Sequence, residues 1–493
     1  MVLSNRDYVK ILQMGIALTT ERDNNKWLES VVDTGMSITN CDAGILYLYQ
    51  DNVLQLRILR TISQGIDRGR NGQEITDIPP VIYEESNICA YAAIHNEIIN
   101  IENIYHSDKF DFSGQKTYDA MTGFQTQSIL VVPLEDNVGN VLGVLQMMNA
   151  KDWEGNIISF DSEYEIIIGS LGSLAAIELT NIQYVDAIKI QLRSFVEAMA
   201  TAIDARTPYN GNHTRKVAQY ALMLADEMNK KHKEGKCEES FDLNRRERLE
   251  LAALLHDIGK MIIPKSVMNR ATRLDEDIQA VEDRFALLDA YYEIDGLKGR
   301  ISEDEKLQQK QYLKETMAFI QTINNAGVLT DDKIARVTEI GAHSYQKTNG
   351  EKIDYLTPRE RECLSVQKGT LTEEDRKIME SHVTMTAKIL EKVRFNKFYE
   401  QVPVWASEHH EFLDGSGYPN HLKAEDLSLE TRILTVSDIY DALTAKDRPY
   451  KPAMPKEKAF AILHTMVEEG KLEDRLVNWL EEAITNGEEE KYG

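Results

Sequence analysis

Cysteine is scarce in this sequence, and no long apolar run occurs. Four cysteines in 493 residues, with no Cys-x-x-Cys pair among them, exclude a disulfide framework and a cysteine zinc site, so we expect a reducing, cytoplasmic setting. The N-terminal residues carry charges where a signal peptide needs an apolar core. The longest apolar run, residues 166–179, has about 14 residues and is too short to span a bilayer. These absences predict a soluble protein without membrane insertion.

Basic residues are outnumbered by acidic ones. The chain has 56 Lys plus Arg against 81 Asp plus Glu, a net charge of −25. Binding of nucleic acid or of an anionic membrane needs a broad basic face, which this acidic excess argues against. A small anionic substrate is not excluded, because a bound metal can reverse the local field. The 42% hydrophobic and 28% charged content is typical of globular proteins, and the length predicts about two to four domains.

The first part of the chain alternates helical and strand patterns. Apolar residues at helical spacing predict a helix over residues 26–38, and β-rich runs follow at 43–49 and 53–62. Two further runs, 127–134 and 141–149, flank a turn-forming Asn-Val-Gly-Asn segment and predict a hairpin. This order of elements resembles a GAF domain. The resemblance implies an α+β fold, an antiparallel sheet flanked by helices, with a small-molecule ligand whose identity stays open.

A few residues partly match the signature of GAF domains that bind cyclic nucleotides: Asn149, Lys151, Phe160, Asp161 and Glu163. The alternative interpretation is that they only end a strand and begin the closing helix of the domain.

A connecting helix without breakers is expected over residues 181–204. Its apolar residues recur at heptad-like gaps, at Ile182, Val185, Leu192, Val196, Met199 and Ile203. This spacing predicts a helix that pairs with its copy in a homodimer. The alternative is a helix that packs on its own chain.

The helical C-terminal half places ionisable residues where an apolar helix has no structural use for them. His256 and Asp257 are adjacent in the run Leu-Leu-His-Asp-Ile-Gly-Lys. Burying both without a partner is costly, whereas an imidazole and a carboxylate are natural ligands of Fe, Mn or Zn, and a carboxylate can bridge two ions. Lys260 follows His256 by four residues, hence on the same helical face, where it can meet a phosphate oxygen.

Two further motifs carry metal-competent side chains. His409 and His410 precede the segment Asp-Gly-Ser-Gly-Tyr-Pro. Because adjacent helical residues point about 100° apart, both imidazoles can reach one ion only near a helix end. Asp438 and Asp441 share one helical face, and the segment Asp-Arg-Pro-Tyr-Lys that follows adds cations.

Together, the His-Asp pair, the His-His-Glu-x-x-Asp-Gly-x-Gly-Tyr-Pro run and the Asp-x-x-Asp run resemble the HD-GYP family of HD-superfamily phosphodiesterases over about residues 194–480. The resemblance implies an all-α helical bundle. Its implied activity is hydrolysis of a cyclic dinucleotide, most often cyclic di-GMP to linear pGpG or GMP, by a metal-activated water under control of the GAF domain. The alternatives are another nucleotide such as 3′,3′-cyclic GMP-AMP, or a non-catalytic metal-binding signalling module.

The resemblance also implies the site, with two divalent ions, Fe or Mn before Zn or Ni. One ion would be held by His213, His256, Asp257 and Asp438, and the other by Asp257, His382, His409 and His410. The implied catalytic residues are Asp257 and Lys260, and the implied substrate contacts are Lys260, Asp441, Arg448 and Lys451. The implied structural loop consists of Gly415, Gly417, Tyr418 and Pro419. For Asp441 the alternative is a role in orienting a metal ligand.

The sequence departs from the family in two places. Residues 207–210 lack the acidic residue that would serve a third metal, which favours two ions. The stretch between His256 and His382 is far longer than the short helix-turn-helix of typical members, so we expect a mostly helical insertion of unknown role. The expected domains are an N-terminal helix (1–23), a GAF-like domain (24–180), the connecting helix (181–204), a phosphodiesterase domain (205–480, with the insertion at 275–368) and an acidic tail (481–493).

Overall fold

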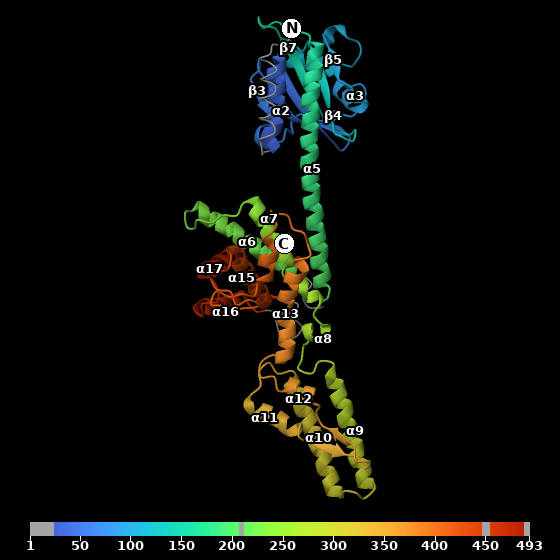
Figure 1. Ribbon diagram of the computed structural model, residues 1–493, viewed down its shortest axis with the longest axis vertical. Helices are drawn as coiled ribbons and strands as arrows, with labels where there is room; N and C mark the ends of the chain where they lie inside the picture. Colours follow the sequence, from blue (N-terminus) through green and yellow to red (C-terminus); the bar gives the residue numbers. More distant parts are fainter. Residues whose placement is uncertain (1–23, 207–211, 446–453, 488–493) are drawn as a thin grey trace. The chain divides into compact units, whose positions relative to one another are not determined.

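The computed structural model describes residues 24–206, 212–445 and 454–487. The chain divides into two compact units, Met1–Gln191 and Leu192–Gly493 (Figure 1). The helix predicted in residues 1–23 and the end of the predicted tail lie outside the described residues.

The first unit is an antiparallel sheet with helices on both faces. The central strands follow the order β3-β2-β1-β7-β6-β5, while β4 pairs with β2 and β8 with β7. The strands are β1 (Cys41–Gln50), β2 (Val53–Thr61), β3 (Ile66–Arg68), β4 (Val81–Ile82), β5 (Ile99–Ile101), β6 (Ile129–Glu135), β7 (Val141–Lys151) and β8 (Ile157–Ile158). The helices are α2 (Asn24–Thr39), α3 (Ile88–His95), α4 (Ser113–Thr122) and α5 (Ser162–Asp204), with short 3₁₀ turns η1 (Arg70–Gly72) and η2 (Ile104–His106).

Alternation of side chains along the strands produces two apolar cores, one on each face of the sheet. On one face, Val31 of α2 and Leu171 of α5 pack with Leu46 and Leu145, and Figure 1 shows both helices over this face. On the other face, Ile88 of α3 lies in a core with Val144. The predicted helix, the strand pair β1 and β2 and the hairpin β6 and β7 are confirmed.

The residues that partly match the cyclic-nucleotide signature have structural roles. The Asn149 side chain accepts a hydrogen bond from the Gln127 amide at 2.7 Å and donates to a neighbouring carbonyl, which ties two chain segments together. Asp161 accepts a hydrogen bond from the Glu163 amide at 3.2 Å at the start of α5. These contacts support the interpretation that the residues end a strand and begin a helix.

Helix α5 begins in the first unit and ends in the second. Near its end, Val196, Ala200 and Ile203 are buried in the core of the second unit. The coiled-coil seam predicted through Val196 and Ile203 is therefore wrong, because this part of the helix packs on its own chain. Among the described residues, α5 is also the helix whose length and hydropathy would suit a membrane span, although part of it is buried in apolar cores. A single such helix is weak evidence of a membrane span.

The second unit contains a helical bundle and the insertion. The bundle comprises α6 (His213–Lys233), α7 (Leu243–Leu255), η3 (Ile258–Met261), α8 (Lys265–Met268), α13 (Glu373–Leu390), α14 (Val402–Ser407), α15 (Leu429–Thr444), α16 (Lys456–Glu468) and α17 (Asp474–Thr485). Helix α17 continues past residue 481, where we expected the tail to begin, because Ala483 and Ile484 are buried in the bundle core. The predicted fold class, an α+β domain followed by a helical bundle, is confirmed.

The insertion is mostly helical and has an apolar core of its own. It contains α9 (Asp277–Leu297), α10 (Glu303–Asn324), α11 (Asp331–Ile340), the short strands β9 (Ser344–Gln346) and β10 (Lys352–Asp354), and α12 (Pro358–Leu364). The carboxylate of Asp375, at the start of α13, accepts from Arg270 at 2.7 Å and from Arg359 of the insertion at 2.6 Å. The pair with Arg359 attaches the insertion to the helix that carries His382.

Candidate metal centre

The His-Asp pair lies in a turn where two helical segments meet. Helix α7 ends at Leu255, and the 3₁₀ turn η3 begins at Ile258. Our expectation that His256 and Asp257 lie inside one helix is therefore wrong. The break matters because it turns both side chains inward, and each residue is only 1% exposed.

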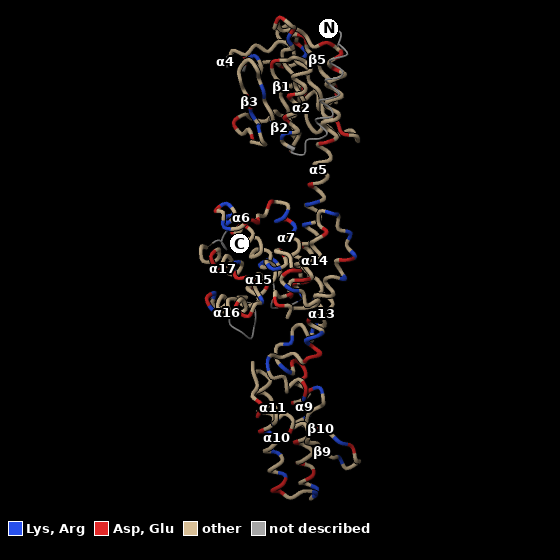
Figure 2. Tube along the Cα trace, turned by 60° about the vertical axis from the view of Figure 1, so that its left-hand side comes forward, with Lys and Arg blue, Asp and Glu red and all other residues tan. Residues whose placement is uncertain are grey.

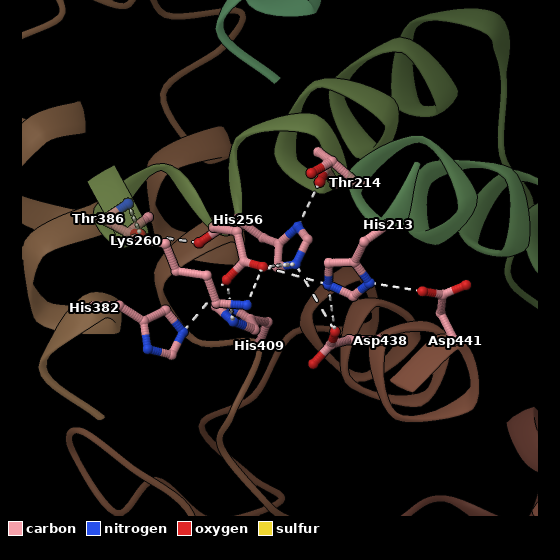
Figure 3. Close-up of polar contacts among 12 residues, drawn as sticks. His213, Thr214, His256, Lys260, His382, Thr386, His409, Asp438 and Asp441 are labelled. Carbon is pink, nitrogen blue, oxygen red and sulfur yellow. Dashed lines mark hydrogen bonds and ion pairs between the residues drawn. The ribbon is translucent and has the colours of Figure 1, made fainter. Parts of the chain in front are cut away.

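The remaining predicted metal ligands come from four other segments of the second unit. His213 is the first residue of α6, and His382 lies within α13. His409 and His410 follow the end of α14 at Ser407, as the helix-end argument predicts. Asp438 lies on α15. The fold thus brings together residues that are far apart in the sequence, and Figure 3 shows His213, His382, His409 and Asp438 around one site.

Asp257 lies between two groups of histidines. Its Oδ2 atom is 3.3 Å from Nε2 of His213 and 3.2 Å from Nε2 of His256. Its Oδ1 atom is 3.4 Å from Nε2 of His382 and 4.0 Å from Nε2 of His409. One carboxylate therefore presents a different oxygen to each group, which is the arrangement of a bridging ligand.

Asp438 and His410 complete the two groups. The Oδ1 atom of Asp438 is 3.2 Å from Nε2 of His213, and its Oδ2 atom is 3.8 Å from Nδ1 of His410. The donor atoms of His213, His256 and Asp438 lie within 4.8 Å of one another, and so do those of His382, His409 and His410. Two adjacent donor sets result, each of a size that suits one ion.

Hydrogen bonds to the outer ring nitrogens orient these imidazoles. The Nδ1 atom of His256 lies 2.6 Å from the Ala253 carbonyl oxygen, and Nδ1 of His382 lies 2.6 Å from that of Met379. His409 makes the same contact at 2.8 Å, with the carbonyl of Ala406. Each carbonyl accepts the ring N–H, which leaves the Nε2 lone pair facing the site.

Burial keeps the second histidine group neutral. It lowers the pKa of His382 to about 4, and it lowers those of His409 and His410 as well. His213 behaves differently: burial opposes its charge, but contacts with Asp257, Asp438 and Asp441 raise its pKa well above the usual value. Neutral imidazoles are the form that binds metal.

The site fits divalent metal ions. Nε2 of His256, His382 and His409 and Oδ1 of Asp257 are buried and complete no hydrogen bond within the described residues. Four such atoms aimed at one another would be costly to bury, and a cation satisfies all of them. Imidazole and carboxylate donors suit Fe, Mn, Zn or Ni.

The structure gives Asp441 a different role from the predicted substrate contact and places Lys260 in a turn. Asp441 is 1% exposed, and its Oδ2 atom lies 2.7 Å from Nδ1 of His213, so it orients that ring and is a poor candidate for substrate contact. Lys260 lies in the 3₁₀ turn η3, not on a continued helix, and its ammonium group contacts Oδ2 of Asp257 at 2.5 Å. Arg448 and Lys451 lie outside the described residues.

The glycine-rich loop after the two histidines passes close to them. Gly415 has a positive φ of 81°, which a side chain would strain. At Gly417 a Cβ would lie 2.5 Å from the His410 carbonyl oxygen, so only glycine fits. The ring of Tyr418 lies against His410, with 4.9 Å between centroids, and Pro419 follows it. This arrangement supports the predicted structural role of the loop.

Sequence reasoning missed two residues that join the His-Asp turn to α13. The Thr386 hydroxyl donates to the His256 carbonyl at 2.9 Å and accepts from the Gly259 amide at 3.0 Å. At Gly259 a Cβ would lie 1.9 Å from the His382 carbonyl oxygen. In the sequence, Gly259 is only a glycine within the motif, and Thr386 is only a threonine four residues after His382. Neither feature predicts a contact by itself.

The first unit contains a separate cavity of about 250 Å³. Apolar side chains such as Ile45 and Met148 line it, together with uncharged polar ones such as Thr126 and Gln146. No charged residue is among the described residues that line it.

Comparison with known families also separates an N-terminal domain from a C-terminal one. A GAF-domain model matches residues 23–179, and two HD-domain models match residues 210–304 and 356–476. The segment between the two HD matches lies inside the insertion.

Curated relatives match a short part of the chain. A 3′3′-cGAMP-specific phosphodiesterase of Vibrio cholerae serotype O1 is 42% identical over 104 residues, which cover 20% of this chain and 22% of the relative. A cyclic di-GMP phosphodiesterase response regulator of Xanthomonas campestris is 38% identical over 103 residues, and a cyclic di-GMP phosphodiesterase of Thermotoga maritima is 36% identical over 103, each match covering 21% of this chain and 27% of the relative. The matched region thus spans about a quarter of these relatives.

Among solved structures, the GAF domain of a phosphoenolpyruvate-protein phosphotransferase from Coxiella burnetii aligns with 37% of this chain and 99% of its own length. The TM-score is 0.30 and the identity 17%.

Proposed function

We propose that this chain, which carries a GAF domain followed by an HD domain with a large insertion, is a metal-dependent phosphodiesterase that hydrolyses a cyclic dinucleotide. The observation that carries the proposal is the Asp257 carboxylate, which offers one oxygen to each of two histidine groups. The proposed boundaries are those expected from the sequence, with the catalytic region at 205–480 and the insertion at 275–368.

Each residue of the centre has a role in this proposal. The first ion would be held by His213, His256, Asp257 and Asp438, and the second by Asp257, His382, His409 and His410. When bound, two divalent ions supply positive charge to the phosphodiester and help to ionise the attacking water. Asp257 lies between the two donor sets and presents one oxygen to each. Asp441 contacts Nδ1 of His213 and so orients the ring with Nε2 toward the site.

Cations of the chain bind the phosphates in this proposal. Lys260 reaches Asp257 from the rim of the site, with its side chain 20% exposed, so it is placed to exchange that carboxylate for a phosphate oxygen. Arg448 and Lys451 are proposed to assist on the grounds of sequence alone.

The favoured substrate is cyclic di-GMP, with 3′,3′-cyclic GMP-AMP as the second candidate, since relatives named for each match the chain. Some of these relatives are named for cyclic di-GMP and others for 3′3′-cGAMP, so their names do not decide between the two substrates. The insertion does not decide either, because the motifs of the family do not include it. A non-catalytic signalling module is the third candidate, which the convergence of seven metal-competent side chains, most of them buried, disfavours.

Turnover by the metal-loaded protein tests the proposal. The full chain is loaded anaerobically with Fe or Mn, its metal content is measured, and it is incubated with each cyclic dinucleotide. Chromatography of the products distinguishes linear pGpG from GMP. We expect hydrolysis that Asp257→Ala abolishes. Absence of turnover with two ions bound would contradict the proposal.

The GAF domain is proposed to regulate this activity. The cavity of about 250 Å³ has no charged residue in its described lining, so it suits an uncharged small molecule better than a phosphate-bearing nucleotide. A cytoplasmic homodimer without nucleic-acid or membrane partners completes the proposal.

A further inference from the structure

Polar contacts join the last turns of α5 to the helical bundle of the second unit. Charged residues of both signs lie along these turns (Figure 2). One of them, Arg193, forms an ion pair with Glu250 of α7 at 2.6 Å. One turn before the end of the helix, the Thr201 hydroxyl accepts a hydrogen bond from Arg215 of α6 at 2.7 Å. The end of α5 is therefore tied to two helices of the bundle, α6 and α7.

Asp204, the last residue of α5, makes a further contact with the start of α6. Its Oδ1 atom accepts a hydrogen bond from the Thr214 hydroxyl at 2.7 Å. Both residues are buried, with exposed fractions of 5% for Asp204 and 0% for Thr214. Breaking a hydrogen bond to a buried carboxylate leaves a desolvated group without a partner, which is costly. This contact therefore holds its two segments together more firmly than a surface contact would.

The start of α6 has little else to fix its position. Asn212 precedes the helix and, in the described part of the chain, its side chain makes no capping hydrogen bond to the first turn. Such a bond normally satisfies amide groups at a helix start. Asp204 instead places a negative charge at this end, where the helix dipole favours it. The same turn carries His213, the residue before Thr214 (Figure 3).

Arg206 ties the end of α5 to the other side of the metal centre. Its Nη2 group donates a hydrogen bond to the Ile263 carbonyl at 3.0 Å. The Ile263 amide in turn donates to the carbonyl of Lys260 at 3.2 Å, in the turn that follows Asp257. Two residues apart, Asp204 and Arg206 thus contact the segments on both sides of the first donor set.

We propose that Asp204 is a positioning residue for the first ion, which holds His213 through Thr214 at the distance from Asp257 that this ion requires. In the structure, Nε2 of His213 and Oδ2 of Asp257 are 3.3 Å apart. The proposal rests on the two-ion centre of the proposed function, but it concerns metal affinity and not turnover.

The two donor sets differ in their relation to α5. Members of the first set lie on segments that the end of α5 contacts: His213 on α6, and His256 and Asp257 at the turn after α7. The histidines of the second set lie on α13 and after α14. A displacement of Asp204 therefore acts on the first set and leaves the second in place. Because α5 begins in the first unit, the GAF domain can act on the first ion through this contact.

Variants that retain one donor set allow the two ions to be measured separately. His382→Ala removes a ligand of the second set and Asp438→Ala one of the first, so each protein should bind a single Mn²⁺ in equilibrium dialysis. Added to His382→Ala, Thr214→Val removes the hydroxyl at nearly constant side-chain size and should weaken Mn²⁺ binding about 10-fold. Added to Asp438→Ala, the same change should leave Mn²⁺ binding unaltered.

Two control variants separate positioning from general stability. Thr214→Ser keeps the hydroxyl, so the affinity of His382→Ala for Mn²⁺ should not change when it is added. Thr201→Val removes an exposed hydroxyl of α5 and should also leave that affinity unchanged. A purely structural role of Asp204 would instead lower the melting temperature and weaken both ions alike, which would overturn the proposal.

A double-mutant cycle tests whether Asp204 acts through Thr214. In the His382→Ala protein, Asp204→Ala and Thr214→Val should each weaken Mn²⁺ binding, and the two together should weaken it no more than the larger single effect. Additive effects would overturn the proposal, and so would an unchanged affinity in the Thr214→Val protein.

The outcomes also separate this inference from the proposed function. A chain that binds two ions, shows the Thr214→Val effect and hydrolyses no cyclic dinucleotide would remove the proposed activity and leave the role of Asp204 intact. An active chain in which Thr214→Val leaves the first ion unaffected would do the reverse. A chain that binds no Mn²⁺ would overturn both.

Discussion

Replacing Gly259 by alanine tests whether close packing between two segments sets the position of a metal ligand. A Cβ at Gly259 would lie 1.9 Å from the His382 carbonyl oxygen and 2.6 Å from the Thr386 amide nitrogen. Both neighbours are backbone atoms of α13, so neither can rotate away. Ordinary contact between carbon and oxygen needs about 3.5 Å, and α13 would therefore have to retreat by about 1.5 Å at the residue that carries a ligand.

The size of the effect follows from this displacement. Overpacking of this kind lowers the free energy of unfolding by about 1–3 kcal/mol. A misplacement of about 1 Å at a reaction centre lowers turnover by about 100-fold. We therefore expect Gly259→Ala to fold, to retain the ion on the side of His213, to lose the ion on the side of His382, and to turn over cyclic di-GMP about 100-fold more slowly.

Metal content by mass spectrometry, thermal unfolding and turnover together check this prediction. Gly327→Ala is the control, because a Cβ at Gly327 meets no atom within 4 Å. The control should match the wild type in all three measurements. Full metal content and full turnover in Gly259→Ala would refute the reasoning that the turn and α13 hold the ligands in place.

Other changes probe the rest of the second unit. Asp257→Ala should lose both ions and all turnover while keeping its helical circular dichroism, and retained activity would contradict the bridging role. Asp441→Asn should weaken metal affinity about 10- to 100-fold in equilibrium dialysis, because the orienting carboxylate is lost; unchanged affinity would remove that role. Asp375→Ala should lower the free energy of unfolding in urea by about 3 kcal/mol, because Arg270 and Arg359 both lose their ion pair with Asp375. Glu362→Ala, at an exposed ion pair, should change it by less than about 0.5 kcal/mol. A chelator should lower the melting temperature of the wild type and leave that of Asp257→Ala unchanged.

Much of the site could be predicted from the sequence, because histidine and aspartate are rarely placed among apolar residues unless they bind a metal or another partner. His256 and Asp257 in a run of leucines, and two histidines before a glycine-broken loop, point to metal whatever the tertiary structure. The details that depend on backbone direction could not be predicted. The contact of His256 with the Ala253 carbonyl and the break of the helix at Leu255 arise from how the turn packs on α13.

The fold shows the same division. Runs of β-forming residues on either side of turn-forming segments predicted the pairing of β1 with β2 and of β6 with β7, since both signals are local. Helix α5 was predicted as a helix, but its apolar period could not show which face its own chain covers. Val196 proved to be buried and Ile188 exposed, a distinction that only the packing of the two cores establishes.

The insertion leaves and rejoins the bundle at one point. The Thr370 hydroxyl donates to the Arg270 carbonyl at 3.1 Å, so its two ends are neighbours. Because the two ends of the insertion are in contact and the entropic cost of closing a loop grows slowly with its length, the insertion costs the bundle little stability. Such a segment can be gained or lost in a single event without shifting the ligands on either side. The junction between Arg270 and Thr370 is accordingly the place where a short linker could replace the whole insertion, or where an unrelated small domain could be grafted.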